Sequence, residues 1–250
     1  MICRGAGESC HRAAMEPGEY ALMDDAEARM WWYRALHARL LRALDGVAGP
    51  VLDAGCGTGG LLAVLAARRP ELELFGVEWA WMAAARAAAK SGASLVRGSV
   101  NALSFADASF SAVVSADVLC HAAVRPDAAL AELRRVLRPG ARLVVNVPAF
   151  AWLMSAHDRQ VHNSRRLSAG ALRVLLARAG FGDIRTRYWN GLLLPLMVAR
   201  RKLPARAERS DVAAVSPWLD ATLHAITELE RRLPVRMLAG GSVLATAVRL

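Results

Sequence analysis

The sequence predicts an α/β domain with a parallel β-sheet and crossover helices. Short apolar runs typical of strands alternate with helical segments along most of the 250 residues, which is the usual pattern of such a sheet. A glycine-rich turn at 51–60, VLDAGCGTGG, joins an apolar strand directly to a helix. A helix predicted over 127–137 is followed by Pro139 and Gly140, as helix ends commonly are.

The elements follow one another in a regular order. A helix over 28–45 precedes the first strand and carries Trp32, Leu36, Leu40 and Ala43 on one side. The apolar runs predict strands at 51–54, 71–78, 94–98, 111–118, 141–148, 183–189 and 242–250. Helical patterns between these strands lie at 60–68, 81–91, 127–137 and 169–179.

Two segments fall outside this alternation. Residues 1–24 contain charges but no apolar core, so they predict a flexible tail rather than a signal peptide. Residues 25–250 are then expected to form one domain. Within it, 190–240 is rich in helix formers and broken by prolines, which predicts a helical cap on the substrate side.

The number and distribution of charged residues limit the kinds of molecule that the protein is expected to bind. Lysine and arginine number 32, aspartate and glutamate 22, and the formal net charge is +10. The basic residues are scattered and do not alternate with aromatics, which argues against nucleic-acid binding. The longest apolar run, 191–199, is much shorter than the roughly 18–20 residues that cross a bilayer. We therefore expect a cytoplasmic protein, with peripheral membrane contact and oligomeric state left open.

The cysteines indicate neither disulfides nor a metal site. The four cysteines contain no C-x-x-C pair and no cluster with histidine at metal-ligand spacing. Cys56 lies inside the glycine turn, and we interpret it as a small packing residue because a catalytic thiol would need a nearby base.

The glycine turn predicts a nucleotide-like ligand. Gly55, Gly57 and Gly59 lack the Cβ atoms that would block a close approach, and the following helix directs free N–H groups toward the ligand. With Gly60 the turn also fits the dinucleotide pattern G-x-G-x-x-G. Asp53 favours a cationic ligand such as S-adenosylmethionine, because a carboxylate would repel a diphosphate. A turn without any ligand is the remaining interpretation.

Glu78 gives a second signal. It ends the second strand, 23 residues after Gly55, and ligands of parallel sheets lie outside the carboxyl ends of the strands. A carboxylate there can accept hydrogen bonds from both ribose hydroxyls. Trp79 and Met82 follow and could flank an adenine, although a tryptophan at a helix start is as often part of the core.

Further motifs spread over about 29–188. They are the Asp107-x-x-Phe110 turn, SADV at 115–118, LAELRRVLRPGARLVVNVPA at 130–149, Trp31-Trp32-Tyr33, the segment 148–168 and Tyr188-x-Asn190. Together with the glycine turn and Glu78, they resemble the class I S-adenosylmethionine-dependent methyltransferases, in particular a bacterial small-molecule subgroup.

This resemblance implies a Rossmann-like, seven-stranded sheet in the order 3-2-1-4-5-7-6, with an antiparallel last strand and helices on both faces. It implies S-adenosylmethionine across the carboxyl ends of strands one, two and four. Asp53, Gly55 and Gly57 would hold its methionine end, Glu78 the ribose, and 98–100 the adenine. The full predicted set of cofactor contacts is Asp53, Gly55, Cys56, Gly57, Gly59, Glu78, Trp79, Ser99, Val100 and Asp117.

Three positions depart from the family pattern. Ser99 stands where many members carry the aspartate that accepts the adenine amino group, and Cys120 replaces an acidic residue before the histidine that follows strand four. Ala141 replaces the second glycine at the start of strand five. These departures leave room for altered or lost catalysis.

Methyl transfer is an in-line displacement, so the protein mainly aligns the acceptor and excludes water, and no metal is required. A general base would help a hydroxyl or acidic-carbon acceptor. His121 is the first candidate base, with a packed structural histidine as the alternative. His157 is the second candidate, and we expect it to lie with Asp158 and His162 in a loop near the acceptor pocket.

Three further groups have two interpretations each. Arg165 and Arg166 would clamp an anionic acceptor or pair with local carboxylates. Trp31-Trp32-Tyr33 would form a lid or the apolar stripe of a packing helix. The run 192–202 is apolar at its start and basic at its end. It would contact an apolar acceptor or an anionic membrane surface, or it would pack in the core.

We therefore predict an S-adenosylmethionine-dependent methyltransferase that modifies a small, apolar or lipid-like acceptor at oxygen or carbon. A nicotinamide-dependent oxidoreductase and a non-catalytic cofactor-binding protein of the same fold are the alternatives.

Overall fold

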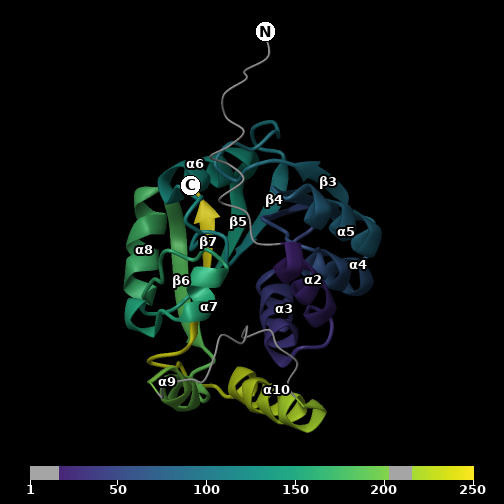
Figure 1. Ribbon diagram of the computed structural model, residues 1–250. Helices are drawn as coiled ribbons and strands as arrows, with labels where there is room; N and C mark the ends of the chain where they lie inside the picture. Colours follow the sequence, from purple (N-terminus) through teal and green to yellow (C-terminus); the bar gives the residue numbers. More distant parts are fainter. Residues whose placement is uncertain (1–16, 203–215) are drawn as a thin grey trace.

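The computed structural model describes residues 17–202 and 216–250 and contains one sheet of seven strands in the order β3-β2-β1-β4-β5-β7-β6 (Figure 1). β7 runs antiparallel to both of its neighbours, and the other pairs are parallel. The predicted order and the predicted antiparallel last strand are confirmed. The strands are β1 (Pro50–Ala54), β2 (Glu73–Glu78), β3 (Ser94–Arg97), β4 (Phe110–Ala116), β5 (Leu137–Pro148), β6 (Phe181–Trp189) and β7 (Ser242–Arg249).

Helices cover both faces of the sheet (Figure 1). α6 and α8 pack on one face, while α3 and α4 pack on the other. The helices are α2 (Pro17–Ala26), α3 (Trp31–Ala43), α4 (Gly60–Arg68), α5 (Trp81–Ser91), α6 (Pro126–Val136), α7 (Ala156–Gln160), α8 (Ala169–Arg178), α9 (Leu194–Lys202) and α10 (Pro217–Arg232), with a short 3-10 helix at Ala151–Leu153. None of these described helices is long and apolar enough to cross a membrane.

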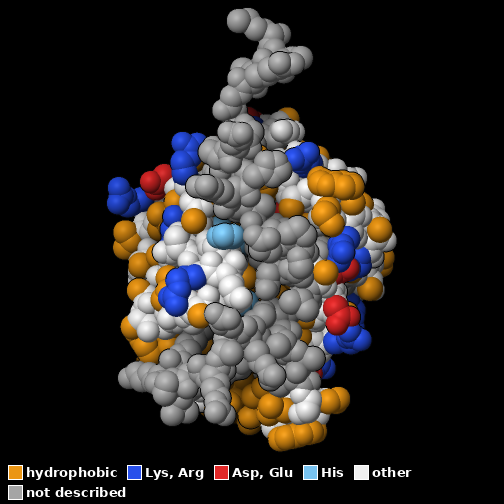
Figure 2. All heavy atoms as spheres, in the orientation of Figure 1, with side chains coloured by type: hydrophobic (Ala, Val, Ile, Leu, Met, Phe, Trp, Pro, Cys, Tyr) orange, Lys and Arg blue, Asp and Glu red, His pale blue; other side chains and the backbone are white. Residues whose placement is uncertain are grey.

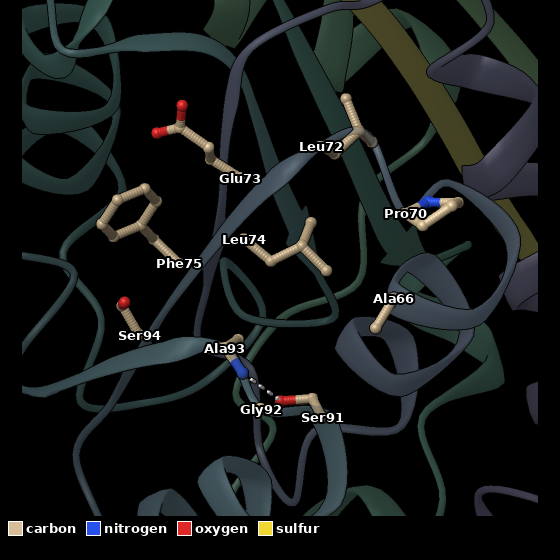
Figure 3. A pocket seen from close by; sticks show the side chains of 10 residues that line it. All are labelled: Ala66, Pro70, Leu72, Glu73, Leu74, Phe75, Ser91, Gly92, Ala93 and Ser94. Atoms are coloured by element: carbon tan, nitrogen blue, oxygen red, sulfur yellow. Dashed lines mark hydrogen bonds between the residues drawn. The ribbon is translucent and has the colours of Figure 1, made fainter.

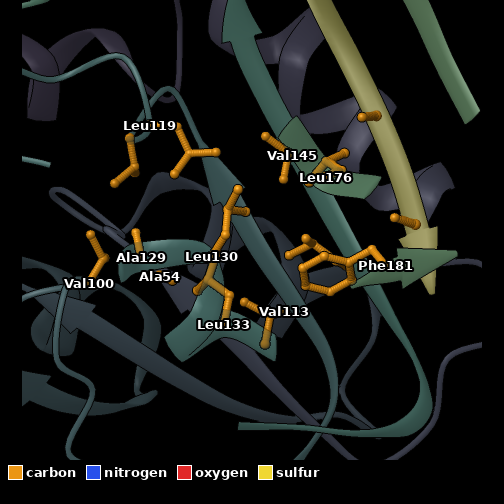
Figure 4. Packing of buried hydrophobic residues seen from close by; sticks show 14 of the residues in the cluster. Ala54, Val100, Val113, Leu119, Ala129, Leu130, Leu133, Val145, Leu176 and Phe181 are labelled. Carbon is orange, nitrogen blue, oxygen red and sulfur yellow. The ribbon is translucent and has the colours of Figure 1, made fainter. Parts of the chain in front are cut away.

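The core lies on both faces of the central strands. Val113 and Val145 point to the face covered by α6 and α8, where Leu130 and Leu133 pack against them (Figure 4). The neighbouring Val114 belongs to the cluster on the opposite face, as the alternation of side chains along a strand requires. Because both faces are buried, the strands appear in the sequence as continuous apolar runs.

The α6–β5 junction differs from the prediction. Pro139 and Gly140 do not terminate a helix, because β5 already begins at Leu137 and includes both residues. Leu137 pairs with Phe110, and the register between β4 and β5 shifts before the next pair. The irregular pairing gives the chain room to pass through Pro139 and Gly140 within the strand.

The tail predicted for 1–24 is wrong in its last part. Residues 1–16 lie outside the described residues, but 17–24 belong to α2. The last turn of this helix is held by contacts distant in sequence: Asp24 and Glu27 both form ion pairs with Lys90 of α5. The sequence of α2 has no strong apolar stripe that would predict a helix. Its conformation therefore depends on its tertiary contacts.

The predicted cap contains α9 and α10, which follow the carboxyl end of β6. β6 is parallel to β5, since both run antiparallel to β7, so this end lies at the same edge of the sheet as the glycine turn. Glu230 of α10 anchors the insertion: its buried carboxylate accepts hydrogen bonds from the backbone N–H groups of Asn190, Gly191 and Leu192 (2.7, 2.6 and 3.0 Å). Arg39 of α3 lies 3.5 Å from the same carboxylate.

We expect Glu230→Ala to lower the free energy of unfolding by about 3 kcal/mol, because it leaves buried N–H groups and the buried Arg39 without their partner. Glu228→Ala is the matched control on the same helix. It breaks only a half-buried pair with Arg231 and should cost less than about 1 kcal/mol. Urea unfolding of both variants measures the difference, and equal small losses would contradict this anchoring role.

Candidate functional site

The glycine turn packs too closely for side chains. A Cβ on Gly55 would lie 2.4 Å from Val118 Cγ2, and one on Gly59 would lie 2.6 Å from the Cα of Ala87. Both glycines have positive φ, +88° and +86°, which other residues adopt only with strain. The missing Cβ atoms therefore let Val118 and Ala87 pack directly against the turn at the carboxyl end of β1.

The backbone amides of this turn are mostly occupied. The N–H groups of Gly55 and Cys56 both donate to the carbonyl of Val77 (2.9 and 3.0 Å), and Gly59 N–H donates to the carbonyl of Cys56 (3.0 Å). Gly57 N–H donates to Glu78 Oε2 (3.0 Å). These four amides are therefore engaged within the protein, and the prediction that N–H groups of the following helix face a ligand stays a prediction.

Three buried carboxyl groups surround the turn instead. Asp53 is 3% exposed, Glu27 6% and Glu78 8%. Burial, together with the nearby Glu27 and Glu78 charges, raises the pKa of Asp53 to about 8. Burial also raises the pKa of Glu27 and Glu78. This surrounding is unfavourable for an anion and favourable for a cation.

Glu27 brings α2 onto the site. Its carboxyl carbon lies 2.7 Å from the position that a Cβ on Gly60 would take, so it occupies the N-terminus of α4, where helix N–H groups attract negative charge. The ammonium of Lys90 lies 2.9 Å from Oε2 of Glu27. Met23, one helical turn earlier, would touch a Cβ on Gly57 at 2.8 Å. A diphosphate would compete with Glu27 for this helix end.

Glu78 is held by two backbone groups. Its Oε1 accepts from Ala80 N–H (2.9 Å) and its Oε2 from Gly57 N–H (3.0 Å). A carboxylate has about four acceptor positions, so two remain for hydroxyl groups of a ligand. Its predicted role toward ribose is compatible with this geometry.

The side chains after Glu78 are exposed rather than part of the core. Trp79 is 40% exposed, Met82 42% and Trp81 64%. The core interpretation of Trp79 is therefore wrong, and an aromatic surface lies next to Glu78. Ser99 Oγ accepts from Asn101 N–H (3.2 Å), and Val100 is buried.

Cys56 and Cys120 are both buried, free thiols. Cys56 packs with Leu62 and Ala87, as the sequence predicted. Cys120 Sγ lies 2.9 Å from the carbonyl of Asp117 and 3.1 Å from Asn163 Oδ1. Burial raises the pKa of both thiols. Among the described residues no group of three or more histidine, cysteine, aspartate or glutamate side chains is placed to hold a metal.

The two arginines after the fifth strand serve the fold. Arg166 is buried and forms a bidentate ion pair with Asp158 (2.8 Å at the closest). Arg165 Nη1 donates to the carbonyls of Leu119, His121 and Val124. Pairing with a local carboxylate is therefore confirmed for Arg166, whereas Arg165 binds backbone carbonyls through Nη1.

The candidate histidines lie near this ion pair. His157 and Asp158 are in α7 rather than in a loop, because Ser155 and Asp158 form a capping box that starts this helix. His157 Nδ1 is buried without a hydrogen-bond partner in the described part of the chain. His121 pairs with Asn163 through a backbone bridge, and burial lowers its pKa. His162 follows α7 with a positive φ of 56°.

The aromatic group at the start of α3 packs within the fold. The Trp32 ring lies 5.9 Å from the buried Trp189 ring and 5.1 Å from Tyr33. Trp31 N–H donates to Asp220 Oδ1 of α10 (2.6 Å). These contacts support the packing-stripe interpretation, whereas the glycine turn is covered by α2.

A surface hollow of about 380 Å³ lies elsewhere, between Leu74 and Phe75 of β2 and Gly92 and Ser94 near β3 (Figure 3). It adjoins the start of β3 and the first half of β2. Ligands of open parallel sheets lie at the opposite, carboxyl end. The hollow is therefore separate from the glycine turn.

Comparisons with known proteins agree with this geometry. Residues 52–145 match the family model described as "Methyltransferase domain". A predicted methyltransferase of Encephalitozoon cuniculi is 31% identical over 142 residues, which are 56% of this chain and 61% of that protein. The alignment thus spans about three fifths of the relative's length.

Solved structures share the fold. A Thermotoga maritima S-adenosylmethionine-dependent methyltransferase, a possible histamine N-methyltransferase by its description, superimposes with a TM-score of 0.59 at 18% identity, covering 93% of this chain and 96% of that one. Geranyl diphosphate C-methyltransferase of Streptomyces coelicolor A3(2) has a TM-score of 0.59 at 16% identity, with coverage of 87% and 80%. Phosphoethanolamine N-methyltransferase 2 of Haemonchus contortus has a TM-score of 0.59 at 19% identity, with coverage of 87% and 52%.

Residues 52–145 thus match a methyltransferase domain, and the sheet has the fold of these solved methyltransferases.

Two features of this site were not predicted from the sequence. Glu27 lies outside the recognised motifs, and only tertiary contact brings it to the turn. Asn146 lies in an apolar run at 143–147, where a lone buried amide signals a specific hydrogen-bonding role. Its partners, Asp117 and Trp189, are far apart in sequence.

We expect Gly55→Ala to destabilise the protein by about 3 kcal/mol or more, because strain at positive φ adds to the clash with Val118. Gly92→Ala is the matched control. Gly92 also has positive φ (+66°), but nothing lies within 4 Å of its added Cβ, so only about 1–2 kcal/mol should be lost. Chemical unfolding measures both, and equal losses would mean that the close contact is unimportant.

The buried carboxyl of Asp53 predicts a pH dependence. Its folded-state pKa of about 8 lies above the unfolded value near 4, so between these values the folded protein holds a proton that the unfolded chain has released. Stability should therefore fall as pH rises through this window. Asp53→Asn should recover about 1–3 kcal/mol at pH 8 relative to pH 5. The exposed Asp45→Asn is the control, and parallel curves for all three proteins would contradict the prediction.

Proposed function

We propose that this protein is an S-adenosylmethionine-dependent methyltransferase. The observation that carries the proposal is the bare glycine turn of a methyltransferase domain with Asp53, Glu27 and Glu78 buried around it. The turn lies at the carboxyl end of β1, where ligands of open parallel sheets bind. The carboxyl groups suit the positive charges of S-adenosylmethionine and oppose the diphosphate of a nicotinamide dinucleotide, which argues against the oxidoreductase alternative.

In this proposal each predicted residue has a defined task. Asp53 binds the ammonium at the methionine end, while Gly55, Cys56, Gly57 and Gly59 form the backbone surface beneath it. Glu78 accepts the ribose hydroxyls. Trp79 covers one side of the adenine, and Ser99 and Val100 border its other edge. Asp117 borders the methionine end from β4. When bound, S-adenosylmethionine supplies an electrophilic methyl group.

We further propose a small, apolar or lipid-like acceptor that is methylated at oxygen or carbon. Apolar side chains at the carboxyl edge support this. Phe150 stacks between Tyr188 (5.1 Å) and Trp152 (5.7 Å), and Trp152 is 61% exposed. In the insertion, Leu196 is 57% and Trp218 70% exposed, and hydrophobic side chains gather over α10 at the bottom of Figure 2. The insertion would then serve as the cap over this acceptor.

The structural neighbours do not narrow the choice of acceptor molecule. Their names state methyl transfer to histamine (as a possibility), to phosphoethanolamine and to geranyl diphosphate. The acceptor of this chain must therefore be argued from its own residues.

His121 and His157 are the proposed general bases. Burial lowers the pKa of His121, so its imidazole is neutral at neutral pH and can accept a proton. His157 has a buried Nδ1 without a partner among the described residues, which leaves that nitrogen free for an acceptor group.

Calorimetric titration tests the proposal. We expect S-adenosylmethionine and S-adenosylhomocysteine to bind and NAD not to bind. Glu78→Gln should weaken both adenosyl ligands by about 1–3 kcal/mol, the usual range for a charged hydrogen bond. Glu73→Gln, an exposed position at the start of the same strand, should not change affinity. Preferential binding of NAD would overturn the proposed function.

A further inference from the structure

Asp117 has an unusual backbone conformation at the carboxyl end of β4. Its φ is +56°, in the left-handed region that residues other than glycine seldom adopt. Strain of this kind persists where surrounding contacts impose it, and it is frequent at functional sites. Here the N–H of Asp117 donates to the carbonyl of Asn146 (2.8 Å), and the Cys120 thiol donates to the carbonyl of Asp117 (2.9 Å).

The carboxyl group of Asp117 is oriented by a chain of hydrogen bonds. Trp189 Nε1 donates to Asn146 Oδ1 (2.8 Å), and Asn146 Nδ2 donates to Asp117 Oδ1 (3.0 Å). An indole N–H can only donate, so it fixes which end of the Asn146 amide faces Asp117. Asn146 is fully buried and Trp189 is 3% exposed. Within the described residues no donor reaches the second carboxyl oxygen, Oδ2.

Asp117 lies beside the glycine turn. Its neighbour Val118 supplies the methyl group that would meet a Cβ on Gly55 at 2.4 Å, and β4 pairs directly with β1. The side chain itself is half-buried, so it is accessible from the carboxyl edge. This position is next to the methionine end of the proposed cofactor site, on the side of β5 and the aromatic stack.

Burial is the main influence on the ionisation of Asp117. Burial raises its pKa to about 7, against the opposing effects of the Asn146 hydrogen bond and the positive charge of Arg166, while Asp158 adds a smaller upward shift. A carboxyl group that titrates near the working pH is suited to accept and release protons.

We propose that Asp117 faces the acceptor side of the transferred methyl group and takes the proton that the acceptor loses, with Asn146 and Trp189 as positioning residues. This inference rests on the proposed function. As the acceptor's O–H or C–H bond breaks, its electron pair forms the bond to the methyl carbon. The carbon–sulfur pair remains on sulfur as a thioether, and the proton goes to Asp117 Oδ2. The assignment adds a carboxyl base to the two candidate histidines.

Two nucleoside ligands test the location of this carboxylate without a known acceptor. In sinefungin an amine-bearing carbon replaces the methylated sulfonium, so its positive charge lies near the position of the transferred methyl group. S-adenosylhomocysteine has no group there. At pH 8 we expect Asp117→Asn to weaken sinefungin about tenfold and to change the affinity for S-adenosylhomocysteine less than about twofold, by calorimetry.

The same titrations repeated across pH test the base and its positioning. The preference for sinefungin is its affinity divided by that of S-adenosylhomocysteine. In the wild type this ratio should rise as the Asp117 carboxyl group ionises between about pH 6 and 8, and in Asp117→Asn it should stay constant. Trp189→Phe keeps an aromatic ring but removes the donor to Asn146, so it should shift the midpoint of this rise. Asp107→Asn, which changes an exposed carboxylate paired with Arg135, is the control and should leave the preference unchanged.

Three results would overturn the inference. Equal losses of both ligands in Asp117→Asn would place the carboxylate against the shared methionine part. An unchanged preference would place it away from the methyl group. Failure of the wild type to bind either ligand would end the proposed function and this inference together, whereas binding with an unmoved preference would leave the proposed function standing.

Discussion

The close contact between Gly55 and Val118 controls the geometry of the candidate site. It brings β1 and the end of β4 so near each other that no side chain fits between them. As a result, Asp53 and Asp117, at or just beyond the ends of these neighbouring strands, border one edge of the sheet. Sheet order, glycine turn and carboxyl groups therefore form one arrangement, and moving the turn would separate all of them.

Negative charge buried at this edge costs stability. Asp53 has no cationic partner among the described residues, and burial raises its pKa far above the ordinary range. A carboxyl group in this state destabilises the folded protein as it ionises, and a bound cation would reverse the effect. A buried ionised carboxyl group can persist where a cationic ligand binds to it, because the binding free energy offsets the loss of folding stability.

The sequence predicted the sheet almost completely, since both faces of the central strands are buried and these strands contain apolar runs such as 143–145 of β5. The glycine turn was equally readable, because Gly55 and Gly59 hold positive φ that other residues avoid. The hydrogen bonds of the turn could not be predicted from the sequence. The carbonyl of Val77 accepts from the amides of Gly55 and Cys56, and the carboxylate of Glu78 accepts from the amide of Gly57.

What the sequence could not show depends on contacts between distant segments. α2 reaches the turn through Glu27 and Lys90, 63 positions apart in sequence. The insertion is coupled to Asp117 in the same way: Glu230 lies beside Arg39, whose guanidinium stacks 4.7 Å from the Trp189 ring, and Trp189 bonds to Asn146. Each residue alone resembles an ordinary polar or aromatic core residue. Together these contacts form a continuous chain of residues from α10 to the end of β4. Any shift of Trp189 also moves the Asn146 amide that orients Asp117. The position of the cap and the orientation of the Asp117 carboxyl group therefore depend on each other.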